Sequence, residues 1–158
     1  MEPRIDYRSL APEAAEALRG LNAYVRRSGL LEPSLVRLVE VRASQINGCA
    51  FCLDMHTQEA RLAGEGEQRL YALAAWREAP FYTPRERAAL AWTEAVTRLE
   101  DGHVPDEVYQ EARRHFSERE LVDLTLAVVA INGWNRLNVA FRTPAGTWRP
   151  PQGGAAPS

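Results

Sequence analysis

Residues 44–56 read SQINGCAFCLDMH and hold both cysteines of the 158-residue chain, Cys49 and Cys52, together with His56. The Asn-Gly pair at 47–48 interrupts the apolar helical pattern that precedes it, and such a pair is typical of a turn. We therefore predict that one helix ends at Gly48 and that a second helix begins directly after it. The two cysteines would then lie in the first turns of the second helix.

Helical geometry brings the three reactive side chains of this segment together. Each residue of an α-helix advances by about 100°, so Cys49, Cys52 and His56 fall within about 60° of one another. Residues three apart on a helix are close enough for two sulfurs to form a disulfide without unfolding the backbone. The spacing predicts a dithiol that can open and close beside an imidazole.

The position of the cysteines also favours a thiolate. Unpaired N–H groups and the positive end of the dipole stabilise negative charge at a helix N-terminus. A neighbouring histidine adds a proton acceptor or, once charged, a counter-ion. Together these effects lower a thiol pKa from about 8.5 toward neutrality, which a nucleophilic sulfur requires.

The rest of the chain reads with a helical period, and no segment shows the alternation that favours a strand. The stretches 83–86 (TPRE) and 117–120 (SERE) have the capping-box spacing that opens a helix. We predict an all-α helical bundle over residues 1–142, with helices over residues 10–27, 33–46, 48–63, 67–79, 84–99, 105–116 and 118–141.

The sequence Ile46-Asn47-Gly48-Cys49 recurs in part as Ile131-Asn132-Gly133-Trp134. Each copy lies in a long apolar segment that follows a proline or a capping box. We therefore predict a second helix break at Gly133 and a helix-break-helix plan that the two halves share. Only the first copy keeps the sulfurs.

Composition excludes several classes of protein. Hydrophobic residues make up 46% and charged residues 25%, which is ordinary globular usage. Nineteen Lys and Arg against 21 Asp and Glu give a net charge of −2, so no basic excess attracts nucleic acid. No apolar run approaches the roughly 20 residues that cross a bilayer, and the charged start lacks the apolar core of a signal peptide. We expect a cytoplasmic protein without nucleic-acid or membrane partners.

Residues 143–158 form a tail rich in proline and glycine. We expect this tail to be disordered or to lie on a neighbouring subunit, with Trp148 as its one large apolar side chain to be buried there. The segment from Leu35 to Val41 has apolar residues on more than one helical face. Because a single layer of short helices cannot bury them all, we expect a homo-oligomer.

Two alternatives to a redox dithiol remain open on the residues alone. Cysteine is among the most buried residue types, so Cys49 and Cys52 are compatible with a purely structural place in the core. They are also compatible with structural zinc, together with His56 and with Glu40 or a residue of another subunit as the fourth ligand. A thioredoxin fold is disfavoured, because its paired cysteines follow a β-strand.

The thirteen residues from Ser44 to His56 resemble the signature of the AhpD-like alkylhydroperoxidases, within the carboxymuconolactone decarboxylase family. The similarity continues through residues 66–71, 76–78 and 134–138, and so covers most of residues 10–142. The resemblance implies an all-helical subunit that assembles into trimers or hexamers. It also implies a site in which the second cysteine meets a peroxide, the first forms a disulfide with it, and a histidine linked to a glutamate relays protons.

Carried onto this sequence, the resemblance makes Cys52 the peroxide-reactive thiolate, Cys49 its disulfide partner and His56 the base. The residue between the cysteines is Phe51, where some active members of the family have histidine. This difference bears on how strong a peroxidase the chain can be.

The glutamate of the relay is where the sequence departs from the family pattern. The family most often has glutamate twelve residues before the first cysteine, where this chain has Arg37. Glu40 follows one turn later, but on an unbroken helix it would lie about 160° from His56. It reaches the imidazole only if the Asn-Gly break folds the first helix back. We prefer Glu40 as the partner, and Glu59 is the alternative.

Three further polar residues are weaker candidates. We expect His103 in a loop and His115 at a helix end, where its charge favours the helix dipole. We expect Arg136 to point inward and to anchor a carboxylate.

The resemblance and the dithiol together predict a thiol-dependent alkylhydroperoxidase-like antioxidant enzyme or a disulfide reductase. Its substrate would be a peroxide, its reductant an external dithiol or a disulfide-reducing protein, and it would hold no cofactor or metal. One alternative is a lactone decarboxylase or isomerase of the carboxymuconolactone type, although that chemistry needs no paired sulfurs. Another is a non-catalytic redox sensor or a zinc-stabilised module.

Overall fold

The computed structural model describes residues 2–150. Its helices are α1 (Tyr7–Leu10), α2 (Pro12–Ser28), α3 (Pro33–Asn47), α4 (Ala50–Leu62), α5 (Glu67–Ala72), η1 (Leu73–Ala75), α6 (Pro84–Arg98), η2 (Glu100–Gly102), α7 (Asp106–His115) and α8 (Glu118–Phe141). This part of the chain contains no β-strand, which confirms the all-α prediction. None of its helices is both long enough and apolar enough to cross a membrane.

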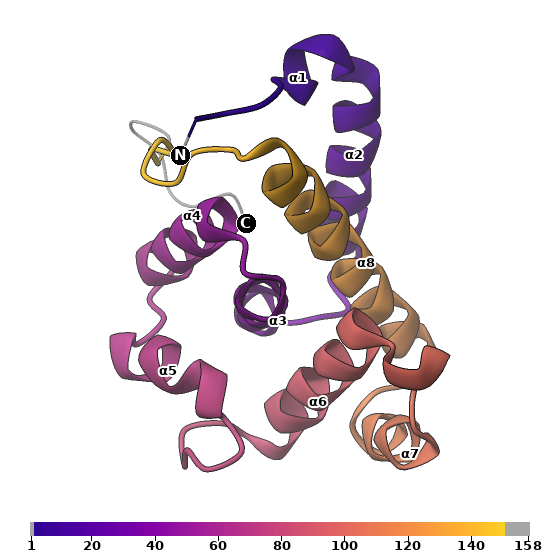
Figure 1. Ribbon diagram of the computed structural model, residues 1–158. Coiled ribbons are helices and arrows are strands. Elements are labelled where there is room, and N and C mark those ends of the chain that lie inside the picture. The colour runs from indigo at the N-terminus through magenta and orange to yellow at the C-terminus, as the bar shows by residue number, and fades with distance from the viewer. Residues whose placement is uncertain (1, 151–158) are drawn as a thin grey trace.

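Helix α3 lies at the centre of the bundle, with α4, α6 and α8 packed around it (Figure 1). Its side chains from Leu35 to Ser44 are buried, except for the half-buried Arg37. Val39 faces a core shared with α2, α6 and α8, whereas Leu38 belongs to a second core beside α4 and α5. The apolar faces of this segment are therefore covered within one chain. They do not support the oligomer that was predicted from them.

Both predicted capping boxes are confirmed. At the start of α6 the Thr83 hydroxyl accepts the N–H of Glu86, and the Glu86 carboxylate accepts the N–H of Thr83. Ser117 and Glu120 repeat the arrangement at the start of α8. Each reciprocal pair satisfies two of the N–H groups that a helix start leaves without partners.

The two copies of Ile-Asn-Gly have different structures. Gly48 ends α3 in the left-handed conformation, with a φ of 63°. Gly133 lies inside the uninterrupted helix α8, so the predicted second break is wrong. A Cβ at Gly133 would lie 3.3 Å from the side chain of Leu18. The absence of a side chain at Gly133 therefore lets α2 pack closely against α8, and this glycine does not form a turn.

Most predicted helix ends lie within two residues of those in the structure, but two predicted helices also differ in their continuity. The first begins at Pro12 instead of residue 10, and the separate short helix α1 precedes it. The helix predicted over 67–79 ends as an α-helix at Ala72. The reason is non-local, because the hydroxyl of Tyr82 donates to the carbonyl of Arg69, which the N–H of Leu73 would use in a continued α-helix. The N–H of Leu73 bonds to the carbonyl of Leu70 instead.

The described part of the tail, residues 143–150, lies on helix α4 of the same chain. The N–H of Gly146 donates to the Asp54 carboxylate at 2.9 Å, and Trp148 packs against the cluster of Phe51 and the cysteines. The sequence predicted a disordered tail or an arm on a neighbouring subunit, whereas this part of it contacts its own subunit. Residues 151–158 lie outside the described residues.

Gly48→Ala is expected to destabilise the fold by about 1 kcal/mol or more, because a Cβ disfavours the left-handed conformation at this turn. Gly20→Ala is the matched control. Gly20 lies within α2, and a Cβ there would meet no atom within 4 Å. Alanine at that position should stabilise the helix by up to about 1 kcal/mol. Denaturant unfolding measures both changes, and a stabilising Gly48→Ala would show that the turn carries no strain.

Candidate active site

The two cysteines form the first turn of α4. Cys49 is the N-cap residue, and its Sγ accepts the backbone N–H of Cys52 at 3.4 Å. Both residues are free thiols, and their Sγ atoms lie 2.6 Å apart. A disulfide can therefore form between them with very little movement of the backbone.

The helix start makes the two thiols electrostatically different. Hydrogen bonds from the thiol and the N–H of Cys52 lower the pKa of Cys49 to about 7, against the opposing effect of burial. The hydrogen bond to Cys49, together with burial and the negative charge of Cys49, raises the pKa of Cys52. In the reduced pair, Cys49 is therefore the thiol that loses its proton more easily, whereas the resemblance gave the thiolate to Cys52.

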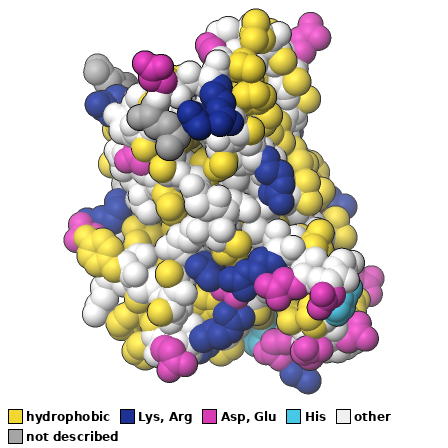
Figure 2. Space-filling model, in the orientation of Figure 1, with side chains coloured by type: hydrophobic (Ala, Val, Ile, Leu, Met, Phe, Trp, Pro, Cys, Tyr) yellow, Lys and Arg dark blue, Asp and Glu magenta, His cyan; other side chains and the backbone are white. Residues whose placement is uncertain are grey.

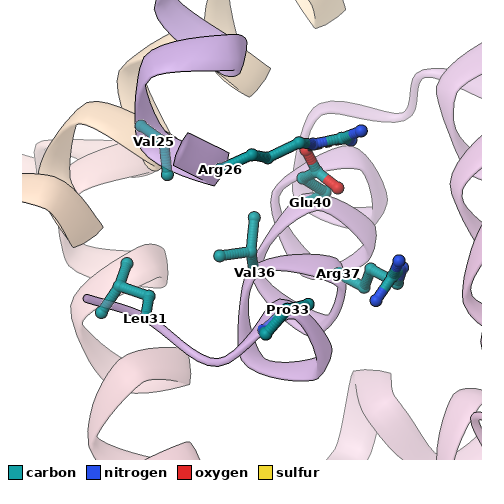
Figure 3. Close-up of a pocket in the computed structure, with 7 residues that line it drawn as sticks. All are labelled: Val25, Arg26, Leu31, Pro33, Val36, Arg37 and Glu40. Atoms are coloured by element: carbon teal, nitrogen blue, oxygen red, sulfur yellow. Dashed lines mark ion pairs between the residues drawn. The ribbon is translucent and has the colours of Figure 1, made fainter. Parts of the chain in front are cut away.

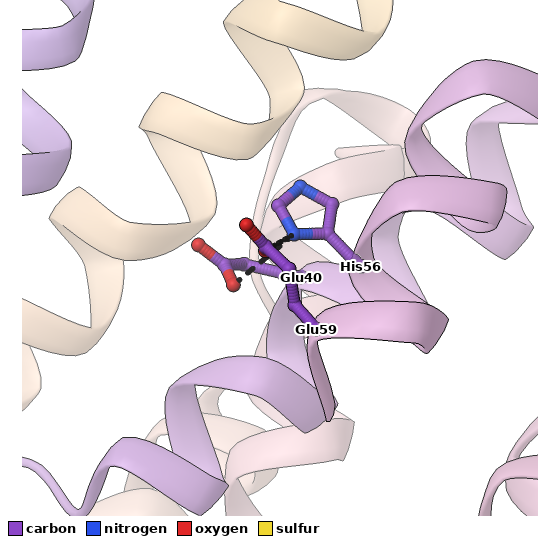
Figure 4. Close-up of side chains that lie close together, drawn as sticks. All are labelled: Glu40, His56 and Glu59. Atoms are coloured by element: carbon purple, nitrogen blue, oxygen red, sulfur yellow. Dashed lines mark hydrogen bonds and ion pairs between the residues drawn. The ribbon is translucent and has the colours of Figure 1, made fainter. Parts of the chain in front are cut away.

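His56 is buried between two glutamates, one turn after Cys52 (Figure 4). Its Nδ1 lies 3.0 Å from a carboxylate oxygen of Glu59 and 3.4 Å from one of Glu40. Both carboxylates considered in the sequence analysis therefore face the same nitrogen. Glu40 reaches it because α3 and α4 fold back on each other at Gly48. The other nitrogen, Nε2, has no hydrogen-bond partner within residues 2–150 and points away from the glutamates.

The charges around His56 favour its protonated form. Burial opposes the positive charge, but Glu40 and the hydrogen bond to Glu59 raise the pKa of His56 above its ordinary value. Burial also acts to raise the pKa of Glu59, yet the hydrogen bond from His56 and the nearby arginines lower it. The carboxylates thus keep a proton on Nδ1, and Nε2 is the nitrogen that can exchange a proton with a bound molecule.

Glu40 is only 2% exposed, so it is not a solvated surface charge. Arg26 of α2 reaches across to it (Figure 3), with 3.5 Å between a guanidinium nitrogen and Oε1. Asn22 donates to the same oxygen. Arg37, which stands where the family pattern usually has glutamate, extends away from Glu40 in the same view. The fold therefore brings Glu40, one helical turn after Arg37, to the imidazole of His56.

Within residues 2–150, the group of side chains that most resembles a metal site consists of Glu40, His56 and Glu59. Ligand atoms of Glu40, His56 and Glu59 lie within 4.8 Å of one another, and neither cysteine belongs to this group. The zinc site considered in the sequence analysis would use the imidazole and both sulfurs as ligands. In the structure, Nδ1 of His56 faces the two carboxylates instead. Arg26 already supplies positive charge beside Glu40, and this charge disfavours a cation there.

Two asparagines of α8 complete the site, and the sequence analysis did not single them out. Nδ2 of the buried Asn138 donates to Sγ of Cys52 at 3.3 Å. The Tyr7 hydroxyl of α1 donates to Oδ1 of Asn138 at 3.1 Å, which orients the amide so that its NH₂ group faces the sulfur. Asn135 donates to Ser44 of α3. The available signal was a series of three asparagines spaced one turn apart, Asn132, Asn135 and Asn138, in the second half of a largely apolar helix, since buried amides need partners.

A cavity of about 790 Å³ opens against this site. Its lining combines apolar side chains with polar groups of the site, namely Phe51, Met55, Trp134, Trp148, His56, Glu59 and Asn138. Cys49 and Cys52 are 1% and 0% exposed, and they lie behind the apolar part of this lining. A molecule in the cavity meets His56 and Asn138 first, and contact with the sulfurs requires the apolar side chains to shift.

The three weaker candidates occupy structural positions. His103 follows η2 in a loop. His115 is the last residue of α7 and contacts Glu111 of the same helix at 3.2 Å. Arg136 binds the backbone and side-chain oxygens of Asn132 one turn earlier. The predicted carboxylate partner of Arg136 is wrong for the part of the chain that the structure describes.

Asn138→Asp keeps the size of the side chain and the acceptor for Tyr7, but it replaces the donor beside Cys52 with an oxygen. In a Cys49→Ser background we expect it to raise the pKa of Cys52 by about one unit or more, because a hydrogen bond to a charged group is worth about 1.5–3 kcal/mol. The pH dependence of thiolate ultraviolet absorbance measures this change. Tyr7→Phe should give a smaller rise, and Tyr71→Phe, at an exposed phenol, should give none. An unchanged Cys52 pKa in Asn138→Asp would refute the assigned role of Asn138.

The chain has only three histidines, so their ring signals can be followed separately by NMR. Glu40→Gln removes a charge that raises the pKa of His56, and we expect the titration midpoint of His56 to fall. Glu111→Gln, beside His115 on α7, is the matched control and should leave His56 where it is. A His56 midpoint that stays constant in Glu40→Gln would mean that this carboxylate does not govern the imidazole.

Comparison with known proteins supports the resemblance noted in the sequence. The family model for the carboxymuconolactone decarboxylase family matches residues 12–95. The chain is 43% identical over 141 residues to the uncharacterized protein YdfG of Bacillus subtilis, an alignment that covers 89% of this chain and 95% of YdfG.

Solved structures show the same fold. The structure of ATU0492 from Agrobacterium tumefaciens, for which an AhpD-type antioxidant-defence role has been suggested, has a TM-score of 0.88 at 45% identity and covers 93% of this chain and 100% of its own. The debrominase Bmp8 has a TM-score of 0.79 at 22% identity over 88% of this chain and 74% of its own, which shows the fold alone. The family match and the 43% identity to YdfG show that the chain belongs to the carboxymuconolactone decarboxylase family and has the AhpD-like fold.

Proposed function

We propose that the chain is a thiol-dependent peroxidase of the alkylhydroperoxidase type, in which a hydroperoxide oxidises the Cys49/Cys52 dithiol and an external dithiol restores it. The observation that carries this proposal is the pair of free sulfurs 2.6 Å apart, one turn from an imidazole that two glutamates hold. Membership of the family and the role suggested for ATU0492 support it. The cycle needs a reducing compartment such as the cytoplasm.

The first step oxidises one sulfur. Because the two sulfurs are 2.6 Å apart, the Cys49 thiolate can take the proton of Cys52, and Asn138 then donates to the new Cys52 thiolate. This thiolate attacks the terminal oxygen of the hydroperoxide, and the O–O bond breaks. Cys52 becomes a sulfenic acid, and the alkoxide that leaves takes a proton from Nε2 of His56 to become an alcohol.

The second step closes the disulfide. The Cys49 sulfur attacks the sulfenic sulfur of Cys52, the S–O bond breaks, and the departing hydroxide leaves as water with the proton that Cys49 carried. Solvent returns a proton to His56. An external dithiol then reduces the disulfide by exchange and is itself oxidised to a disulfide.

Self-association belongs to the same proposal. Apolar side chains of α8 remain half exposed, among them Val122 at 52% and Val129 at 48%. Figure 2 shows hydrophobic side chains gathered over α2 and the adjoining part of α8. Such a band favours contact with a second copy of the chain.

Cys52→Ser is expected to abolish peroxide consumption, because it removes the sulfur that attacks the oxygen. Cys49→Ser should consume about one equivalent of peroxide and then stop with a sulfenic acid on Cys52, because no second thiol resolves it. Thiol titration and mass spectrometry after addition of an alkyl hydroperoxide measure both outcomes. His103→Gln, in a loop outside the site, is the control and should keep full activity.

Full thiol-dependent peroxidase activity in Cys52→Ser would refute this mechanism. Conversion of a lactone acid that survives when both cysteines are serine would favour the decarboxylase or isomerase alternative. One zinc per chain that resists dialysis would favour the zinc-stabilised module.

A further inference from the structure

The cavity beside His56 has the size and wall of a site for an organic molecule. Its volume of about 790 Å³ lies within the range of about 300–1,000 Å³ that is typical of small-molecule sites. Phe51, Met55, Trp134 and Trp148 supply its apolar wall. Hydrogen peroxide needs no such wall, so the cavity favours a substrate with an apolar, ring-sized body.

The charged lining of this cavity is unbalanced toward positive charge. Four arginines line it, Arg8, Arg19, Arg26 and Arg27, against the carboxylates of Glu16 and Glu59. Arg19 pairs with Glu16 at 2.8 Å and Arg26 with Glu40 at 3.5 Å.

Two of the four arginines are available to a ligand. No carboxylate of residues 2–150 lies within 4 Å of the guanidinium of Arg8 or Arg27. Arg8 lies over the ring of Phe51, 5.2 Å from its centroid, so its charge stands at the edge of the apolar wall. A planar guanidinium in this position matches a carboxylate that is joined to a ring.

We propose that the cavity binds an amphipathic organic carboxylate, with its apolar body against the tryptophans and its carboxylate on Arg8 or Arg27. Resting on the proposed function, the substrate is then a hydroperoxide that carries this carboxylate, and it is reduced to the corresponding alcohol. Recognition of the anion does not depend on the redox step, so the two can be tested apart.

The binding experiment uses the reduced full chain and two unreactive probes of the same shape, para-isopropylbenzoate and the neutral para-isopropylbenzamide. Quenching of tryptophan fluorescence reports binding, because Trp134 and Trp148 line the cavity. We expect the benzoate to bind at least tenfold more tightly than the benzamide, and we expect Arg8→Gln or Arg27→Gln to remove about tenfold of its affinity. Arg114→Gln, whose partner is Glu111 on α7, is the matched control and should change nothing.

Equal affinity for the two probes, or an affinity for benzoate that neither arginine variant lowers, would overturn the proposal. The second arm compares cumene hydroperoxide with its para-carboxylate as oxidants. A preference for the carboxylate that Arg8→Gln or Arg27→Gln abolishes supports the inference. If both peroxides are consumed equally, the inference fails while the peroxidase proposal stands. If benzoate binds as expected and neither peroxide is consumed, the peroxidase proposal fails while the anion site stands.

Discussion

The left-handed turn at Gly48 is the constraint on which both the core and the site depend. It folds α4 back against α3, so a carboxylate on one helix meets an imidazole on the next. The same turn leaves Cys49 as the N-cap of α4, where its sulfur accepts a backbone N–H. A straight helix through this point would separate Glu40 from His56 and would deprive Cys49 of its place at a helix start.

Burying charge around His56 is costly, and the structure compensates each charge with a neighbour. Arg26 lies beside Glu40, Glu40 and Glu59 lie beside Nδ1 of His56, and the three side chains at the centre come from two adjacent helices. Such a group behaves as a unit, because removing one member leaves another buried and uncompensated. It also holds the proton on Nδ1, so Nε2 is the nitrogen without a hydrogen-bond partner in residues 2–150.

Each sulfur has its own hydrogen-bond donor, and this arrangement lets one negative charge move between them. The N–H of Cys52 stabilises the charge on Cys49, and the amide of Asn138, oriented by Tyr7, stabilises it on Cys52. The thiol with the lower pKa at rest therefore need not be the one that meets the oxidant. Asn138 lines the cavity and contacts Cys52, and this favours Cys52 for that encounter in the proposed reaction.

The sequence alone determined the all-α class, both capping boxes, the turn at Gly48 and the stripe of Cys49, Cys52 and His56. These features depend on residues within one or two helical turns of each other, so local patterns carry them. Only the tertiary structure decided that Glu40 and Glu59 both face His56, that Asn138 and Tyr7 serve Cys52, and that Gly133 packs against Leu18 instead of breaking a helix. Those outcomes depend on contacts between side chains far apart in the chain, and residue spacing does not encode which helix faces will meet.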